Sequence, residues 1–160
     1  MPDPGSRSLD RTDRRILDIL QRDGRISMTE LAERIGLSAT PCTERVRRLE
    51  RTGVISGYYA RISPRALGRP LLVFLEINLS AKSGDAFDKV KKELLNIAEI
   101  LECHLVSGEF DYLVKARISA MSAYRQLLGE ILKRLPASAQ TRSYVVMEEI
   151  KETLALPIDA

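Results

Sequence analysis

The stretch LSATPCTERVRRLERTG, residues 37–53, decides how the first part of the chain folds. At about 100° per residue on an α-helix, Cys42, Val46 and Leu49 fall within about 60° of one another. Such a stripe packs against another element, so Cys42 is expected to be a small core residue and not a redox or catalytic thiol. The stretch therefore predicts a helix that buries this stripe and leaves its opposite side bare.

The ends of this helix follow from its proline and its glycine. Pro41 is tolerable only in the first turn, because a proline further inside removes a backbone donor that the helix needs. Gly53 supplies a stop after the last cation. We therefore expect the helix to run from about Ser38 or Thr40 to Arg51.

Polar and cationic residues gather on the bare side of the helix. In a helix-turn-helix bound to DNA, the N-terminal part of the second helix contacts base edges, and later residues meet phosphates. Arg14 or Arg15 of an earlier helix would also meet phosphates. The alternative is an ordinary solvated helix that mixes arginine and glutamate. The candidate base contacts are Thr40, Pro41, Thr43, Glu44 and Arg47, the candidate phosphate contacts are Arg48 and Arg51, and Ser38 joins them at the helix start.

Two shorter helices precede this one. Ser27 followed by Glu30 forms a capping box for the second of them, and Gly36 provides its stop. Together with the next helix this predicts a helix-turn-helix motif at about residues 28–47. The first helix, within residues 9–25, has an apolar face formed by Ile16, Leu17 and Leu20, a cap at Asp10 or Thr12, and a stop at Gly24.

Charge is distributed unevenly along the chain. Residues 1–61 hold 12 arginines, no lysine and 9 acidic residues, whereas residues 62–160 hold 13 cations and 13 acidic residues. The planar guanidinium suits phosphate groups and guanine edges. The excess of arginine supports double-stranded DNA as the partner of the first part of the chain.

Composition excludes several other classes of protein. With 160 residues, 44% hydrophobic and 29% charged, the chain has the composition of a soluble globular protein. It has no apolar run of about 18 residues and no apolar signal core, so we expect a cytoplasmic protein without a membrane partner. Cys42, Cys103 and the single histidine, His104, form no metal or catalytic set, so we expect no metal, no cofactor and no enzyme activity.

A second domain follows a linker. Pro64, Gly68 and Pro70 mark residues 62–70 as the linker between a DNA-binding domain at 9–61 and a domain at 71–160, while residues 1–8 form a flexible tail. Within the first domain, residues 54–61 are predicted to form a short strand.

The pattern of the second domain predicts a strand from Leu71, a helix at about 85–96, strands in 101–107 and 111–119, a helix at about 121–135 and a strand in 143–152. This is the ferredoxin-like βαββαβ order, which makes the chain an α+β protein with a winged-helix-like helix-turn-helix at its N-terminus.

The two helices of this second domain cover only one face of its sheet. Leu72, Phe74, Leu113 and Val145 lie on strands whose two alternations are both largely apolar. A second subunit is therefore expected to cover the other face, which predicts a homodimer.

The hairpin HLVSGEFDY, residues 104–112, suggests a small-molecule site. Gly108 lets the backbone approach a ligand, and Asp111 can accept hydrogen bonds from an ammonium group. A free amino acid would suit such a site. Alternatively, Asp111 simply caps the turn.

Several stretches resemble one family across nearly the whole chain, from about residue 9 to 154. GRIS, LAERIGLS, TPCTERVRRLER, ECHLVSGEFDYLVK, SAYRQLLGE and SYVVMEE are similar to the Lrp/AsnC family of bacterial transcription regulators. The resemblance implies a DNA-binding domain followed by a ligand-sensing and oligomerising domain, whose dimers assemble into tetramers or octamers on the nucleoid. It implies sequence-specific regulation of amino-acid metabolism genes; the alternative is a nucleoid-structuring protein that wraps DNA with little sequence preference.

The same resemblance implies an effector site for an amino acid such as leucine or alanine. KSGDAF and the tail RSYVVMEEIKETLALPIDA look more like relatives that control alanine or branched-chain amino-acid catabolism. The positions that the resemblance assigns to the effector are Leu105, Asp111, Met121, Tyr144, Val145 and Val146, to which the hairpin adds Gly108.

Overall fold

The computed structural model of the chain describes residues 9–80, 83–136 and 139–159. The chain divides into two compact units, one ending at Arg61 and completed by the segment from Lys151, the other spanning Ile62–Ile150. This division differs from the expected one, because residues 62–70 belong to the second unit and the chain from Lys151 belongs to the first. The predicted tail, residues 1–8, lies outside the described residues.

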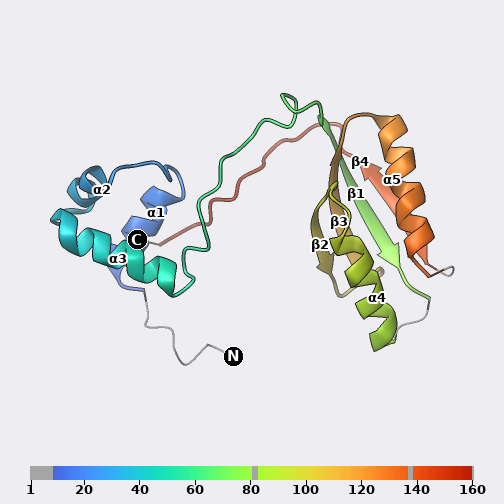
Figure 1. Cartoon of the computed structure of the whole chain (residues 1–160), viewed down its shortest axis with the longest axis horizontal. Coiled ribbons are helices and arrows are strands. Elements are labelled where there is room, and N and C mark those ends of the chain that lie inside the picture. The colour runs from blue at the N-terminus through green and yellow to red at the C-terminus, as the bar shows by residue number, and fades with distance from the viewer. Residues whose placement is uncertain (1–8, 81–82, 137–138, 160) are drawn as a thin grey trace. The chain divides into compact units, whose positions relative to one another are not determined.

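Three helices build the first unit (Figure 1): α1 spans Arg11–Leu20, α2 Met28–Ile35 and α3 Ala39–Arg51. Asp10 caps α1 by accepting a hydrogen bond of 2.7 Å from the Asp13 amide. The prediction that Gly24 stops this helix was wrong, since α1 ends at Leu20 with Gln21 as its C-cap.

Both ends of α2 lie where they were expected. Ser27 caps α2 and accepts a hydrogen bond of 3.1 Å from the Glu30 amide, whereas the Glu30 carboxylate accepts from Arg34 at 2.6 Å, so only this half of the predicted capping box is found. Gly36 follows α2 with φ of 75°, the left-handed conformation that favours glycine. Because the turn brings α2 and α3 together, these elements form the predicted helix-turn-helix.

The apolar stripe of α3 faces the core of the first unit. Cys42 is 0% exposed, Val46 4% and Leu49 1%, and they pack with Ile16 and Leu31 of the other two helices. Burial raises the pKa of the Cys42 thiol, which disfavours the reactive thiolate. The inward orientation predicted from helical periodicity is confirmed.

Residues 54–61 were predicted to form a strand, and this was wrong. Their β-branched and aromatic side chains favour extended backbone, but a strand also needs a partner, and none of the described residues pairs with them. The segment is attached to α3 instead. The Ile55 amide donates to the Leu49 carbonyl at 3.1 Å, and the Tyr58 hydroxyl donates to Glu50 at 3.0 Å.

The C-terminal segment is held within the first unit by its contact with α1. The amide nitrogen of the Gln21 side chain donates to the Leu156 carbonyl at 2.9 Å, and the Gln21 oxygen accepts from the Leu156 amide at 2.9 Å. The segment is therefore anchored at the end of α1 rather than added to the sheet.

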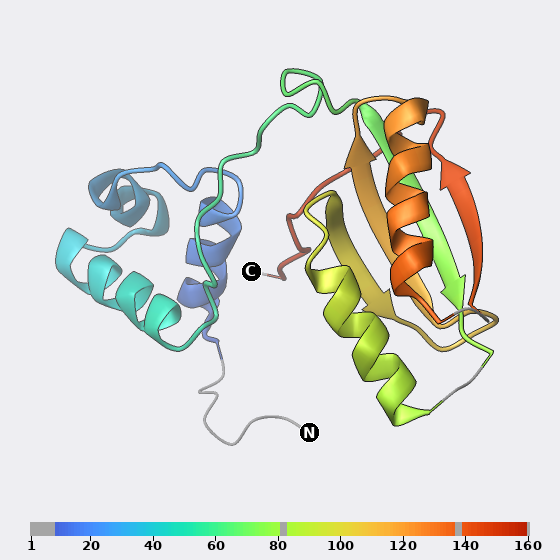
Figure 2. The same ribbon diagram turned by 45° about the vertical axis from the view of Figure 1, so that its right-hand side comes forward.

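The second unit is a four-stranded antiparallel sheet of order β2-β3-β1-β4, with α4 and α5 on one face (Figure 2). It is the predicted ferredoxin-like arrangement. The bounds are β1 Leu71–Asn78, α4 Gly84–Leu95, β2 Ile100–Leu105, β3 Tyr112–Ile118, α5 Met121–Arg134 and β4 Gln140–Val145.

The last strand does not lie where it was predicted. We expected it in residues 143–152, but β4 begins at Gln140 and ends at Val145. The last backbone bond beside it runs from the Val146 amide to the Leu72 carbonyl at 3.0 Å. Beyond this point the chain leaves the ladder, since β1 itself begins at Leu71 and offers no further partner.

The sheet has one face toward the helices and one open face. Leu72, Phe74 and Leu113 lie on the open face, because they alternate with residues of the helix-covered core. Val145 was expected among them, but it pairs with the core residue Val73 and so shares the helix-covered side at the sheet edge. Pairing register decides the face of a side chain, and a shift of one residue reverses it.

Candidate nucleic-acid interface and effector region

The surface of α3 opposite its buried stripe is open. Thr40, Glu44, Arg47 and Arg51 are all exposed, as is Ser38 at the N-cap. Within the part of the chain that the structure describes, neither Arg47 nor Arg51 forms an ion pair. The helix thus presents two uncompensated guanidinium groups on a face that no described element covers.

Two further candidates at the start of α3 are half-buried. The Thr43 hydroxyl donates to the Ala39 carbonyl at 2.8 Å, which leaves its oxygen as an acceptor and its methyl group for apolar contact. Pro41 lies in the first turn and provides an apolar edge without an N–H group. The N-terminal part of α3 therefore carries both hydrogen-bonding and apolar groups, as contact with base edges requires.

Arg48 has a different environment from the one predicted. Its Nη2 atom lies 2.5 Å from Oδ2 of Asp13, whose side chain is 3% exposed. Arg45, which the sequence did not single out, lies 2.8 Å from the other oxygen of Asp13 and 2.6 Å from Asp10. Hydrogen bonds to Asp10 and then Asp13 raise the pKa of the Arg45 guanidinium. Arg48 is thus held within the unit, and a phosphate contact from it requires this ion pair to open.

The arginines of α1 differ from each other. Arg14 is exposed, whereas Arg15 donates to the carbonyl of Arg34 at the end of α2, at 3.1 Å. That contact satisfies an orphan carbonyl at a helix C-terminus. Arg14 is therefore the better candidate of the two for a phosphate contact.

Three of the predicted effector residues lie near one end of the sheet. Leu105 is 64% exposed at the end of β2, and Gly108 follows in the hairpin with φ of 158°. Asp111 is 6% exposed; its carboxylate accepts from the Leu79 amide at 2.7 Å, and its own amide donates to Ile77 at 2.9 Å. The aspartate fastens the hairpin to the residue that follows β1, through an amide 32 positions away and not within its own turn.

The other effector candidates lie near the opposite end. Met121 begins α5 and is 51% exposed, and Tyr144 and Val145 end β4 at 44% and 40% exposure. Val146 is half-buried beside Leu72.

Sheet register separates these two groups. Leu105 lines up through β3 with Ile77, whereas Val145 pairs with Val73, and β2 and β4 are opposite edges of the sheet. The separation is about 14 Å along the strands and about 14 Å across them, which exceeds the length of a free amino acid. One chain alone does not bring these seven residues into a single site.

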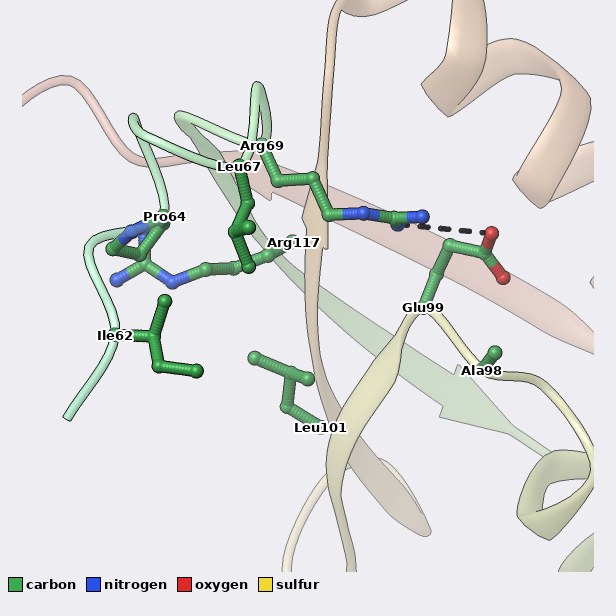
Figure 3. A pocket seen from close by; sticks show the side chains of 8 residues that line it. All are labelled: Ile62, Pro64, Leu67, Arg69, Ala98, Glu99, Leu101 and Arg117. Atoms are coloured by element: carbon green, nitrogen blue, oxygen red, sulfur yellow. Dashed lines mark ion pairs between the residues drawn. The ribbon is translucent and has the colours of Figure 1, made fainter. Parts of the chain in front are cut away.

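A hollow of about 270 Å³ lies elsewhere in the second unit (Figure 3). Arg69 reaches across it toward Glu99, at 3.8 Å. None of the predicted effector residues lines it, and residues 62–70, which contribute to it, were predicted to be only a linker. Its lining residues are Ile62, Pro64, Leu67, Arg69, Ala98, Glu99, Leu101 and Arg117.

Other kinds of site are not found in the described parts of the chain. No group of histidine, cysteine, aspartate or glutamate side chains there could hold a metal ion. Of the helices that the structure describes, none is long and apolar enough to cross a membrane.

Comparison with known proteins identifies both units. A family model described as winged helix-turn-helix DNA-binding matches residues 9–56, and one described as Lrp/AsnC ligand binding domain matches residues 72–156. The chain is 57% identical to the leucine-responsive regulatory proteins of Klebsiella pneumoniae and Escherichia coli, over 97% of this chain and 94% of each relative. These relatives are transcription regulators and not enzymes.

Solved structures agree with these matches. An AsnC family transcriptional regulator from Agrobacterium tumefaciens matches with a TM-score of 0.88 and 31% identity, over 92% of this chain and 96% of that one. A transcriptional regulator of Neisseria meningitidis, solved as a complex with L-methionine, matches with a TM-score of 0.87 and 35% identity, over 94% and 97% of the two chains. The chain therefore belongs to the Lrp/AsnC family of transcription regulators, with a helix-turn-helix unit that binds DNA and a ferredoxin-like ligand-binding domain.

Proposed function

We propose that this protein is a cytoplasmic, sequence-specific regulator of amino-acid metabolism genes whose DNA binding is biased by a free amino acid such as leucine or alanine. The observation that carries the proposal is the two-sided character of α3. One side is buried through Cys42, Val46 and Leu49, and the other side exposes Arg47 and Arg51 without ion-pair partners in the described chain. Nothing among the described residues competes with DNA for that exposed side.

The proposed active form is a homodimer that assembles further into tetramers or octamers. A single small module makes too few contacts for specific affinity, whereas two recognition helices about 34 Å apart meet successive turns of one DNA face. On the open face of the sheet Phe74 and Leu113 are half-buried and Leu72 is 6% exposed, and the two half-buried apolar side chains support pairing of two copies there. In such a dimer, the two recognition helices would bind DNA together, and the protein would be associated with the nucleoid.

The proposed effector site lies between copies of the chain. Its candidate residues form two groups at opposite ends of one sheet, so a second copy would be needed to bring members of the two groups together. The neisserial neighbour and a feast or famine regulatory protein of Mycobacterium tuberculosis were both solved with L-methionine, which supports an amino acid as the ligand class. A ligand between copies would bind assembly states with different affinity and so shift their populations.

The variant Arg47→Ala tests the DNA part of the proposal. Sites would first be selected from random DNA with the natural protein, and affinities for a selected site and for random DNA then compared by gel shift. Loss of a good bidentate base contact is worth about 1–3 kcal/mol, so discrimination is expected to fall about 5- to 150-fold. Arg125→Ala removes an exposed arginine of α5 and serves as the control. Unchanged discrimination in Arg47→Ala would exclude a base contact from this residue.

A thermal-shift screen of the twenty free amino acids tests the effector. A ligand that binds only the folded protein, at 100 times its dissociation constant, stabilises it by about 2.7 kcal/mol. We expect one small apolar amino acid to raise the melting temperature. Tyr144→Ala or Leu105→Ala is expected to weaken the affinity for that amino acid about tenfold and so to reduce the shift. These exposed residues are better probes than Asp111, whose loss would also free the Leu79 amide. A response that both variants retain in full would move the site elsewhere.

A further inference from the structure

Asp13 lies at an unusual position for a carboxylate. It shares one face of α1 with Ile16 and Leu20, at helical spacings of three and seven residues, and all three are buried. An apolar residue would normally occupy such a core position. A carboxylate there has to be desolvated, so its partners should account for its presence.

Both oxygens of this carboxylate are taken by arginines of α3. Oδ1 lies 2.8 Å from Nη1 of Arg45, and Oδ2 lies 2.5 Å from Nη2 of Arg48. Asp10 adds a second acceptor for Arg45 at 2.6 Å. We call this cluster of Asp10, Asp13, Arg45 and Arg48 the α1–α3 clamp.

Stability alone does not explain the clamp. Replacing a buried ion pair by well-packed apolar residues is often neutral or stabilising, because charges lose their hydration on burial. The clamp does, however, divide the arginines of α3 into two classes. The side chains of Arg45 and Arg48 are 30% and 31% exposed and are bound to α1, whereas Arg47 and Arg51 are exposed without ion pairs in the described chain.

We propose that Asp13 is a positioning residue for DNA recognition, which withholds Arg45 and Arg48 from the DNA backbone so that α3 engages DNA through Arg47 and Arg51. This inference rests on the DNA-binding function of the unit. Every arginine that is free to meet a phosphate strengthens binding to all DNA sequences alike. Withholding two of them lowers the affinity for all DNA sequences, so that base contacts, which differ between sequences, contribute a larger share of the binding free energy.

The clamp also fixes the orientation of the recognition helix. Two arginines of α3, one turn apart, are tied to the same carboxylate of α1, which restricts rotation of α3 about its own axis. The angular position of Arg47 relative to the DNA groove then follows from the position of α1. Contacts to base edges need such a fixed approach, because they depend on the alignment of donors and acceptors.

The salt dependence of DNA binding distinguishes this proposal from a purely structural role. Dissociation constants of the full-length Asp13→Asn variant would be measured on random DNA and on a selected site over a range of salt concentrations. Each added phosphate contact increases the magnitude of the slope of log affinity against log salt by about 0.9. Release of both arginines is expected to steepen the slope on random DNA by up to about 1.8. Loss of the fixed orientation of Arg47 is expected to reduce the ratio of specific to non-specific affinity.

Two further variants sharpen this test. Asp18→Asn removes a carboxylate of α1 whose bonds within the described chain go to Arg22 at 3.0 Å and to Gln21 at 3.2 Å and not to α3, and it should leave the slope on random DNA unchanged. Adding Arg45→Gln and Arg48→Gln to Asp13→Asn should return the slope to the natural value. An Asp13→Asn protein that loses affinity for both DNAs in parallel, with an unchanged slope, would overturn the proposal.

If Asp13→Asn does not fold, the two arginine substitutions without it still test whether Arg45 and Arg48 contact DNA. The variant with Arg45→Gln and Arg48→Gln in the natural background is expected to keep the natural slope, because these side chains do not meet phosphates. A slope reduced by about 1.8 would mean that both arginines contact DNA and would overturn the proposal. Failure of the natural protein to bind any DNA would instead contradict the proposed function itself.

Discussion

Replacement of Leu49 by alanine is expected to lower the free energy of unfolding of the helix-turn-helix unit by about 2–5 kcal/mol. Leu49 is 1% exposed and packs among the buried residues of all three helices. Its loss removes apolar contacts and leaves a cavity that the surrounding helices fill only in part. Since small domains are stable by only about 5–15 kcal/mol, this loss removes a large share of the stability of the unit.

Chemical denaturation followed by circular dichroism measures this loss. Leu154→Ala is the matched control, because Leu154 belongs to the same unit and is 89% exposed. An exposed substitution away from special contacts changes stability by only about 0.5 kcal/mol. Equal destabilisation by the two variants would contradict the inward orientation of the α3 stripe. DNA affinity should fall with the folded fraction, since α3 presents Arg47 only when Leu49 is packed.

Local sequence patterns predicted most of the secondary structure correctly. The spacing of Cys42, Val46 and Leu49 gave the buried side of α3, and therefore its exposed side, from helical geometry alone. Gly36 gave the turn because a left-handed residue strongly favours glycine. These features depend on residues near one another in the chain, which is why one sequence was enough to find them.

Features that depend on distant partners were missed. Arg48 resembled a free cation of α3 because its partner, Asp13, lies 35 positions earlier in the chain. Residues 54–61 have strand-forming side chains, but only tertiary structure decides whether a strand finds a neighbour. Val145 was grouped with Leu72, Phe74 and Leu113 because the register of β4 against β1 could not be predicted from the sequence.

The effector region shows a different limit. The resemblance supplied six positions and the hairpin added Gly108, and the structure separates these seven residues into groups near Leu105 and near Val145. A family motif identifies residues but gives no distances between them. It therefore could not reveal that the two groups lie at opposite ends of the same sheet. Likewise, the hollow beside Arg69 arises from a segment whose prolines and glycine suggested only a linker.

The second large effect is expected for Glu149→Ala in the ligand-binding domain. Arg117 lies on the open face of the sheet and is only 7% exposed, and its two terminal nitrogens bind the two oxygens of Glu149 at 3.0 and 2.5 Å. Removing one member of a buried ion pair costs about 3–5 kcal/mol, because the other charge stays desolvated. The Glu149 side chain is 36% exposed, so water can partly replace it, and we expect a loss of about 2–3 kcal/mol.

Glu148→Ala is the control for this prediction. Glu148 is exposed and forms no ion pair within the described ranges, so its loss should change the free energy of unfolding by no more than about 0.5 kcal/mol. If the loss of Glu149 from the buried guanidinium causes the destabilisation, adding Arg117→Met to Glu149→Ala should restore part of the stability, as a double-mutant cycle would measure. A loss in Glu149→Ala as small as in the control would mean that Arg117 is satisfied without Glu149. The large loss would instead identify this pair as the contact that holds the chain beyond β4 against the open face of the sheet, four residues after the ladder ends at Val145.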